Sequence, residues 1–454
     1  MKKKVFAVAV CFMLLFSGCT STQGSDKDGS YASTQESSGL PAEESAAKTA
    51  SGETSAEISG DLILRTCDDP STISTWETYI NSFHESYPNV KITLKAEGSP
   101  WNSETYRTGV SVEMFSGEAG DLLDLSFLPG PKYAESGLLV EVDSLLENMP
   151  GFSWESYYTN VFDAVRYKGG LYYVPYEMDL FGIRLNKLVS DQLDFQEEGR
   201  DTISIPELLE LCRKANELPG LPEDFYTESG ADWTFLSSFE MSSYVQEGNK
   251  SASFTSKEFI DYLENLKALP FPQNMRYGMY GSDQKEFPES QFYGFIALQP
   301  IGESNAQRYL ESAESELVTK YMLTETSLGG KTFETNAIGI TSSCKDLEAA
   351  TAFVRFLLDT DIKKEKADLL SWMFPVNRRV NQEILRRSFG TGQEEVVQQM
   401  DKWCGQVDTL MLLQRSPELF AVLQEIMGEY MDGLISPEQC AQKLQERAEI
   451  YLQE

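Results

Sequence analysis

Histidine is almost absent from this chain, and cysteine is scarce. The 454 residues include one histidine and seven cysteines, and no pair of cysteines has the C-x-x-C spacing of a metal or redox motif. A multi-histidine zinc site, a Ser-His-Asp triad and a Cys-His pair therefore find no support in the sequence. We expect His84 to lie on the flank of an amphipathic helix. The five cysteines that follow Cys19 are expected to be structural thiols, with one disulfide among them left open.

Long apolar runs and positive charge are also lacking. No stretch reaches the roughly 18 consecutive apolar residues of a membrane-spanning helix. Acidic residues number 71 and basic residues 38, which gives a net charge of −33. A surface this negative repels the phosphates of nucleic acid and anionic lipid head groups, so we expect no nucleic-acid partner. The chain is nevertheless 41% hydrophobic, and its length is ample for two domains.

The N-terminus has the order of a bacterial lipoprotein signal. Three lysines, Lys2 to Lys4, precede a short apolar stretch, Val5 to Phe16, which is too short to cross a bilayer. The sequence Phe16-Ser-Gly-Cys19 resembles a lipobox, with phenylalanine where leucine is more usual. We therefore expect residues 1–18 to be a signal peptide and Cys19 to be acylated, for example with palmitate. Such an anchor would hold the protein at the outer face of the cell membrane. An ordinary secretory signal is the alternative.

Residues 19–60 are expected to form a disordered tether behind that anchor. The segment from 20 to 60 is dominated by Ser, Thr, Gly, Ala and Glu, and Tyr31 is its one aromatic residue. Such a composition buries too little apolar area to offset the entropy of ordering. A flexible coil of this length spans roughly 35 Å, from about 5–6 Å times the square root of the residue number. The folded part of the chain is then expected to begin near Asp61.

Strand and helix patterns alternate after the tether. Leu62–Thr66 and Val90–Ala96 have strand patterns, and between them Trp76–Tyr87 places its large apolar side chains on one helical face. This order is a βαβ unit and predicts a parallel sheet. Ser204–Glu207 has the pattern of a capping box, and Leu347–Leu358 has a second apolar helix face. The sequence therefore predicts an α/β fold.

A series of short motifs runs in a fixed order over nearly the whole mature chain. Each motif is weak alone, but their order and spacing together are specific. They resemble the landmarks of family 1 extracellular solute-binding proteins, the sugar-type receptors of bacterial ABC importers. The motifs are Tyr87–Leu94, Gly120–Leu125, Tyr133–Asp143, Ala164–Tyr176, Arg184–Lys187, Ile205–Leu209, Gly339–Ser343, Phe374–Asn377 and Ile435–Leu444.

This resemblance implies a two-lobe, periplasmic-binding-protein-like fold of type II with a ligand cleft between the lobes. It further implies a monomeric, non-enzymatic receptor that closes on a sugar or oligosaccharide and passes it to ABC permease subunits. The ligand would sit at the carboxyl ends of the sheets, and neither a metal nor a cofactor is expected. The implied lobe I takes residues 61–177 and 333–376, and lobe II takes residues 178–332 and 377–454, with hinge crossings near Tyr176 and Phe374.

The resemblance also carries individual site residues. Asp179 corresponds to an acid that contacts sugar hydroxyls in maltodextrin-type receptors. Phe420 corresponds to an aromatic stacking position, and Asp69 to an acidic contact after the first strand. Leu125 and Leu128 stand where those receptors have a tryptophan and an acid, which argues against maltodextrin as the ligand.

Further candidates follow from the chemistry of sugars. Flat apolar faces stack on pyranose CH groups, and carboxylates bind paired hydroxyls. Aromatic residues on loops and polar residues beside Asp179 are therefore expected to contact ligand. These candidates are Trp101, Trp233 and Trp372 for stacking, and Tyr176 and Glu177 for their position next to Asp179.

Other functions and simpler roles stay open. The chain is rich in acidic residues, so a lipid-anchored glycoside hydrolase is an alternative, although no spacing singles out a catalytic pair. An orphan surface receptor, or a signalling or adhesion protein on the same fold, is another alternative. Lobe packing is the alternative role for the tryptophans. A turn cap or an ion pair with Arg184 is the alternative for Asp179.

Overall fold

The structure is a computed structural model, and it describes residues 58–99, 103–218, 227–228, 233–269, 296–301, 319–360 and 373–454. The expected signal peptide and Cys19 lie outside these ranges, as do nearly all of the expected tether, Trp101 and Trp372. Within the described ranges, no helix has both the length and the apolar character needed to cross a membrane.

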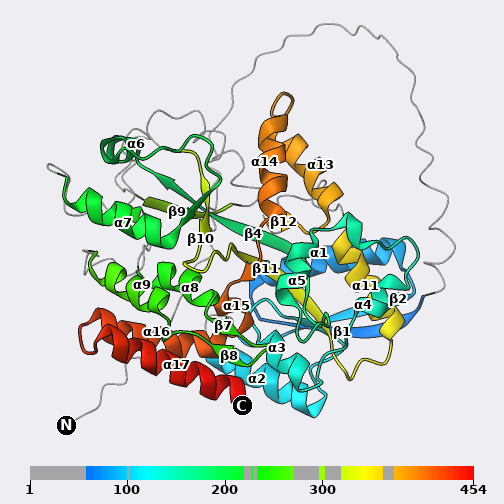
Figure 1. Cartoon of the computed structure of the whole chain (residues 1–454). Coiled ribbons are helices and arrows are strands. Elements are labelled where there is room, and N and C mark those ends of the chain that lie inside the picture. Colours follow the sequence, from blue (N-terminus) through cyan, green and yellow to red (C-terminus); the bar gives the residue numbers. More distant parts are fainter. Residues whose placement is uncertain are drawn as a thin grey trace, which may run out of the picture.

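Strands and helices alternate along the chain, as the sequence predicts (Figure 1). The strands are β1 Gly60–Thr66, β2 Val90–Ala96, β3 Leu122–Asp124, β4 Val174–Leu185, β5 Thr202–Ser204, β6 Thr227–Glu228, β7 Val245–Gln246, β8 Ser251–Ala252, β9 Ile296–Ile301, β10 Met322–Glu325, β11 Thr332–Ile340, β12 Phe374–Pro375 and β13 Thr409–Leu410. The helices are α1 Pro70–Ser86, α2 Ser103–Ser116, α3 Gly130–Glu135, α4 Asp143–Glu147, α5 Thr159–Val165, α6 Lys187–Ser190, α7 Ile205–Asn216, α8 Trp233–Ser242, α9 Lys257–Lys267, α11 Leu347–Asp359, α13 Arg378–Phe389, α14 Glu394–Cys404, α15 Leu412–Arg415, α16 Pro417–Met431 and α17 Pro437–Gln453.

The predicted βαβ unit is confirmed at the start of the fold. Strands β1 and β2 pair in parallel over their whole length, and α1 connects them. The apolar face of α1 buries Trp76, Tyr79 and Phe83, and the ring of Phe83 meets that of Phe353 on α11 at 5.1 Å. His84 is exposed on the flank of this helix, as expected.

One sheet runs through both halves of the molecule. Its main strand order is β2-β1-β3-β11-β4-β10-β5, with β12 and β9 also paired to β4, and β13 paired to β11. Strands β1, β2 and β3 are parallel to one another, so their carboxyl ends meet at one edge. Strand β11 runs antiparallel to both β3 and β4. Figure 1 shows β4 extending from this part of the sheet toward the half that holds α7 and β9.

The buried side chains form two separate cores. The first core draws on β1, α1, β3, β11, α11, α13, α14 and the beginning of β4. The second core draws on the end of β4 together with α7, α8, α9, α16 and α17. In Figure 1 the elements of the second core lie on the left and below, and β1, α1 and α11 lie on the right.

The chain passes between the cores at identifiable positions. On β4, Leu180 belongs to the first core and Phe181 to the second. Further on, Leu410 belongs to the first core and Met411 to the second. Residues 377–410, which the predicted boundaries place in lobe II, therefore contribute side chains to the first core. The division into lobes stays a prediction.

Two smaller predictions have clear outcomes in the described residues. None of the described cysteines after Cys19 is in a disulfide: Cys67, Cys212, Cys344, Cys404 and Cys440 are all free thiols. At the start of α7, the Ser204 hydroxyl accepts a hydrogen bond from the Glu207 N–H at 3.3 Å, which is half of the expected capping box. The Glu207 carboxylate accepts instead from Arg200 at 2.7 Å, because that charged donor lies within reach.

Candidate functional site

The carboxyl ends of β1 and β3 meet at a buried carboxylate, that of Asp124. One of its oxygens accepts hydrogen bonds from the Thr66 hydroxyl at 2.8 Å and from the Trp76 indole N–H at 3.0 Å. The other accepts from the Ser126 N–H at 3.1 Å and from its hydroxyl at 2.7 Å. Four donors hold this group in one orientation, so Asp124 joins α1 to the sheet at the edge where open α/β folds place ligands.

A second carboxylate, that of Glu177, extends this polar network onto β4 and β11, which we call the crossing strands. Glu177 is 2% exposed, and it accepts from the Tyr79 hydroxyl at 2.7 Å and from the Asn336 side-chain amide at 3.0 Å. The Asn336 amide oxygen in turn accepts from the Ser126 hydroxyl at 3.4 Å. Glu177 therefore links α1, β4 and β11. Its predicted contact with ligand stays a prediction.

Asp179 and Glu334 face each other across the two strands. They are direct register partners in the antiparallel pair of β4 and β11, as are Glu177 and Asn336. Side chains two residues apart on a strand share a face, so all four point to the same side of the strand pair. Burial, together with the negative charge of Asp179, raises the pKa of Glu334 to about 8. Glu334 therefore keeps its proton to a higher pH than an exposed glutamate does.

A tyrosine lies near these acids, just before β4. Tyr173 is 4% exposed, and no partner for its hydroxyl is present among the described residues. Burial, with the negative charges of Asp124 and Glu334, raises the pKa of this hydroxyl. The ring packs so closely against Gly130 at the start of α3 that a Cβ atom on Gly130 would lie 2.5 Å from it.

The two cores enclose a pocket of about 800 Å³ that Tyr173 helps to line. The other residues on the side of the first core are mainly residues 163–169, at the end of α5 and in the turn that follows it. The opposite wall is formed mainly by residues 242–249, at the end of α8 and around β7, and by residues 328–330. Of the predicted ligand contacts that the structure describes, none lines this pocket. The pocket and the carboxyl edge of β1 and β3 therefore have different residues. Tyr173 lines the pocket and also lies near Asp124 at that edge.

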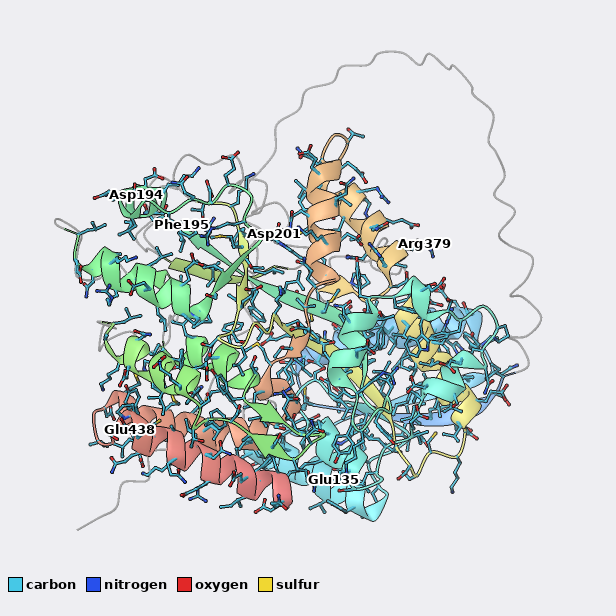
Figure 2. The ribbon with its side chains drawn as sticks, in the orientation of Figure 1. Glu135, Asp194, Phe195, Asp201, Arg379 and Glu438 are labelled. Carbon is cyan, nitrogen blue, oxygen red and sulfur yellow. The ribbon has the colours of Figure 1, made fainter. Side chains whose placement is uncertain are left out.

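We call the part of the molecule around the first core the first half and the part around the second core the second half. Side chains of the two halves touch directly. Arg107 on α2 lies 3.2 Å from Glu418 on α16, and Lys250 lies 2.7 Å from Glu135 on α3. The ammonium group of Lys132 lies 3.7 Å above the ring of Tyr451. Figure 2 places Glu135 where the helices of the first half approach the end of α17. We call this set the inter-core contact.

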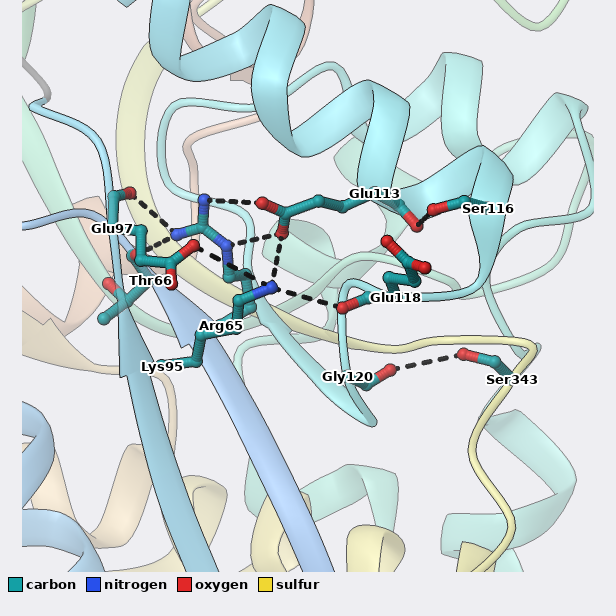
Figure 3. Close-up of polar contacts among 9 residues, drawn as sticks. All are labelled: Arg65, Thr66, Lys95, Glu97, Glu113, Ser116, Glu118, Gly120 and Ser343. Carbon is teal, nitrogen blue, oxygen red and sulfur yellow. Dashed lines mark hydrogen bonds and ion pairs between the residues drawn. The ribbon is translucent and has the colours of Figure 1, made fainter.

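A buried arginine, Arg65, links β1 to α2 and to the residue that follows β2. The Arg65 side chain pairs with Glu113 on α2 at 2.8 Å and donates to the Glu97 carbonyl at 2.8 Å (Figure 3). Lys95 adds a second ion pair to Glu113 at 3.2 Å. Burial acts to raise the pKa of Glu113, but the hydrogen bonds from Arg65 and Lys95 outweigh it and lower that pKa. This cluster ties β1 and β2 to α2.

The remaining predicted residues lie in several environments. Asp69 caps α1, with its carboxylate accepting from the N–H groups of Ser71 and Thr72 at 3.1 and 3.0 Å. Burial acts to raise the pKa of Asp69, but the hydrogen bond from the Ser71 hydroxyl, together with those from these N–H groups, outweighs burial and lowers it. Tyr176 is 4% exposed, and its ring packs 5.8 Å from that of Trp76.

The two aromatic candidates of the second half differ in exposure. Phe420 is 1% exposed and belongs to the second core, so in this conformation it packs with other apolar side chains. Trp233 is partly exposed at the start of α8 and packs against that core from outside. The structure thus gathers Tyr176, Glu177 and Asp179 at the crossing strands and keeps Trp233 and Phe420 in the other half.

Sequence reasoning missed several residues of this site. Glu334 and Tyr173 carry no local signal, because their importance comes from pairing across the sheet. Leu125 and Leu128 are fully buried, but Phe127 between them is 40% exposed. Its position directly after β3 was the available signal, since loops that follow parallel strands line ligand sites. No group of three or more His, Cys, Asp or Glu side chains in the described ranges is arranged to hold a metal ion.

Comparison with known proteins identifies relatives of this arrangement. Residues 69–364 match the family model of the bacterial extracellular solute-binding proteins. An ABC substrate-binding protein of Listeria monocytogenes in complex with cycloalternan superposes with a TM-score of 0.59 at 14% identity, covering 87% of this chain and 99% of that chain. A solute-binding protein of Thermotoga lettingae bound with α-D-tagatose superposes with a TM-score of 0.55 at 16% identity, covering 87% and 100%.

A third structure, a periplasmic oligogalacturonide-binding protein of Yersinia enterocolitica, superposes with a TM-score of 0.59 at 12% identity, covering 87% of this chain and 99% of that chain. No curated protein shows significant sequence similarity to the chain. At these identities the structural likeness shows the fold alone. The mixed α/β, periplasmic-binding-protein fold predicted from the sequence is thereby confirmed.

Proposed function

Since the chain belongs to the bacterial extracellular solute-binding protein family, we propose that it captures a sugar or oligosaccharide between its two halves and delivers it to ABC permeases. The family consists of binding proteins and not of enzymes, in agreement with the sequence analysis. The observation that carries the proposal is the position of Asp179 on β4, one residue before the strand passes from the first core to the second. A solute held there would contact both halves.

The chemistry of the crossing strands supports a hydroxyl-rich solute. The carboxyl group of Glu334 lies opposite Asp179 and that of Glu177 lies two residues away on the same strand, and such groups exchange hydrogen bonds with sugar hydroxyls in a water-poor cleft. Phe127, Trp101 and Trp233 are the aromatic faces that would stack on the pyranose rings. Of the neighbouring structures named above, one is in complex with cycloalternan, one is bound with α-D-tagatose and one is an oligogalacturonide-binding protein. The sugar itself is therefore set by side chains and not by the fold.

Closure by a hinge would complete the capture. The lobes are proposed with the predicted boundaries, lobe I as residues 61–177 and 333–376 and lobe II as residues 178–332 and 377–454, except that residues 377–410 go with lobe I because their side chains join the first core. Strands β4 and β11 are then the strands that bend. The inter-core contact supports this mechanism, because such contacts can form only when the halves approach each other.

The proposed place of action is the outer face of the cell membrane. The lipobox-like sequence before Cys19 supports acylation of that residue, and the acidic tether would hold the folded part away from anionic lipids. A tethered receptor stays near its permeases while its cleft remains open to the medium.

A thermal-shift panel tests this function. The chain with Cys19→Ser, which cannot be acylated at that position, is mixed with cycloalternan, tagatose, xylo-oligosaccharides, galacto-oligosaccharides and glucosamine oligomers. A ligand that binds only the folded state stabilises it by about 2.7 kcal/mol at one hundred times its dissociation constant, which raises the melting temperature. Mass analysis of each mixture then separates a receptor from a glycoside hydrolase, because a receptor returns its ligand unchanged. A panel without any shift, or with cleaved products, would count against the proposal.

A further inference from the structure

The pocket between the two cores has walls from both halves and the volume of a ligand site. Residues 163–169 of the first half and residues between 242 and 249 of the second half form its main walls. Its volume of about 800 Å³ falls within the range of about 300–1,000 Å³ that is usual for sites of drug-sized ligands. Asp179, on which the proposed function rests, does not line it. The pocket therefore needs an explanation of its own.

One carboxylate on α3 connects the two walls. The Glu135 side chain lies 2.7 Å from the ammonium group of Lys250 and 3.6 Å from that of Lys168. Lys168 belongs to the first wall, and Lys250 directly follows the last residue of the second wall. A molecule bound between the walls would therefore keep all its contacts only while the halves hold this arrangement.

The charged side chains that line the pocket balance one another. Three of them are acidic and three are basic, so their formal charges cancel. Arg166 pairs with Asp143 at 2.7 Å, and Arg415 pairs with Glu247 at 3.1 Å. The Asp408 carboxylate accepts a hydrogen bond from a backbone N–H at 2.8 Å. These groups are engaged within the protein, so ionic attraction is not the main force that the pocket offers to a ligand.

The groups that are free to bind are neutral. Tyr173 is 4% exposed, and its hydroxyl has no partner among the described residues. Buried hydroxyls are nearly always hydrogen-bonded, so this one indicates a water molecule or a bound ligand. On the opposite wall, the exposed side-chain amides of Gln246 and Asn249 form no hydrogen bond within the described part of the chain. Hydroxyl and amide groups both donate and accept, as the hydroxyls of a sugar do.

We propose that this pocket is a second binding site, for a hydroxyl-rich molecule of the size of a short sugar, with Tyr173, Gln246 and Asn249 as its contacts. The site is separate from the solute site at Asp179 and does not require it. Because its contacts come from both halves, an occupant stabilises the arrangement in which the halves touch. An ordered water at the Tyr173 hydroxyl is the simpler alternative, and two experiments decide between them.

The first test concerns the Tyr173 hydroxyl in the empty protein. If this hydroxyl has no partner within the chain, Tyr173→Phe removes no hydrogen bond of the fold. We therefore expect the mature chain with Cys19→Ser to melt at the same temperature, or a higher one, when it also carries Tyr173→Phe. A fall of several degrees would show that the hydroxyl is bonded inside the fold, which would overturn its role as a free contact.

The second test measures binding by calorimetry in the Asp179→Ala protein, whose solute site is weakened. The probes are sucrose, trehalose, maltotriose and β-1,4-galactotriose. We expect at least one probe to bind, and Tyr173→Phe to lower its affinity about two- to tenfold, the usual effect of losing one neutral hydrogen bond. Gln246→Ala combined with Asn249→Ala should lower it further, since two contacts are lost. Asn148→Ala, which removes an exposed amide outside the pocket, serves as the control and should have no effect.

The outcomes separate this site from the solute site. Binding that is lost in Asp179→Ala but unchanged in the pocket variants would overturn the second site and leave the proposed function intact. Binding that depends on the pocket residues alone, with no effect of Asp179→Ala, would support the pocket and count against placing the solute at Asp179. If no probe binds in a way that depends on the pocket residues, the Tyr173 hydroxyl is met by water only and the second site is refuted.

Discussion

Arg107 on α2 lies 3.2 Å from Glu418 on α16, and this ion pair joins a helix of the first half to a helix of the second. The side chain of Arg107 is 11% exposed and that of Glu418 is 39% exposed, so water screens the pair only in part. The contact exists only while the halves are close. It therefore couples surface charge to the opening of the cleft.

Removal of this ion pair should favour the open form. Partly exposed pairs contribute about 0.2–1 kcal/mol, so we expect Glu418→Gln to lower the ratio of closed to open ligand-free molecules by up to about fivefold. Small-angle scattering should show a larger radius of gyration for the variant than for the wild type. Glu438→Gln, which changes an exposed acid elsewhere on the second half, serves as the control. Identical scattering profiles for all three proteins would contradict a role for the pair in closure.

Asp179 should matter for binding and little for folding. A hydrogen bond to a charged group contributes about 1.5–3 kcal/mol, so Asp179→Ala should weaken binding of the solute found in the thermal-shift panel by roughly ten- to hundredfold. The melting temperature of the empty protein should change little. If the empty protein instead melts several degrees lower and its affinity is retained, Asp179 has a structural role.

A buried acid in the second half should make stability depend on pH. Glu240 on α8 is fully buried, and its carboxyl group accepts hydrogen bonds from the Ser327 N–H at 3.0 and 3.2 Å. Burial raises the pKa of Glu240 to about 7, although these hydrogen bonds act to lower it. The folded state therefore binds a proton that the unfolded chain releases above its ordinary pKa of about 4.3.

The contribution of Glu240 to stability is complete below that ordinary pKa and is lost as the pH rises toward 7. The slope is at most about 1.4 kcal/mol per pH unit for this one group. Urea denaturation between pH 5 and 8 should show a flatter dependence in Glu240→Gln than in the wild type. Equal slopes in the two proteins would show that Glu240 is already ionised in the fold.

The Arg65 cluster should respond differently to removal of one partner and of both. Glu113→Gln leaves the buried guanidinium of Arg65 without its main counter-ion, and breaking such a pair typically costs about 3–5 kcal/mol. We place the loss near the lower end, because Glu113 is 19% exposed and Lys95 lies nearby. The double variant Arg65→Met with Glu113→Leu should recover much of that loss in urea denaturation. A double variant less stable than either single one would contradict this account.

Cys19 should determine where the protein is found in the cell. Cys19→Ser removes the sulfur that would be acylated, so we expect release into the medium or mislocalisation. Metabolic labelling with a fatty acid followed by cell fractionation measures both effects. Membrane retention in the variant, with no label on the wild type, would refute lipid anchoring.

The sequence predicts local structure well in this protein because the patterns are local. The apolar stripe of α1, the alternation in β2 and the apolar face of α11 each lie within one segment. Their burial follows directly from the period of the pattern. The order of motifs predicts the family for the same reason, since each motif reports one turn or one strand end.

The site is less predictable because it depends on pairings between distant segments. Glu334 meets Asp179 through the register of β11 against β4, and these residues are 155 positions apart in the sequence. Tyr176 and Phe420 were predicted as ligand contacts, but both are nearly fully buried, since an aromatic ring suits a core as well as it suits a sugar face. Sequence composition does not separate these two uses.

The passage of the chain between the cores has a consequence for export. The first core includes Leu62 near one end of the chain and Leu410 near the other, so it cannot be completed until nearly all of the polypeptide is available. A chain that crosses the membrane from its N-terminus would present β1, α1 and β2 long before α13 and α14 arrive to cover their core. Early folding on the secretion path is therefore limited to partial assemblies. An exported chain could therefore not complete its first core before α13 and α14 had crossed the membrane.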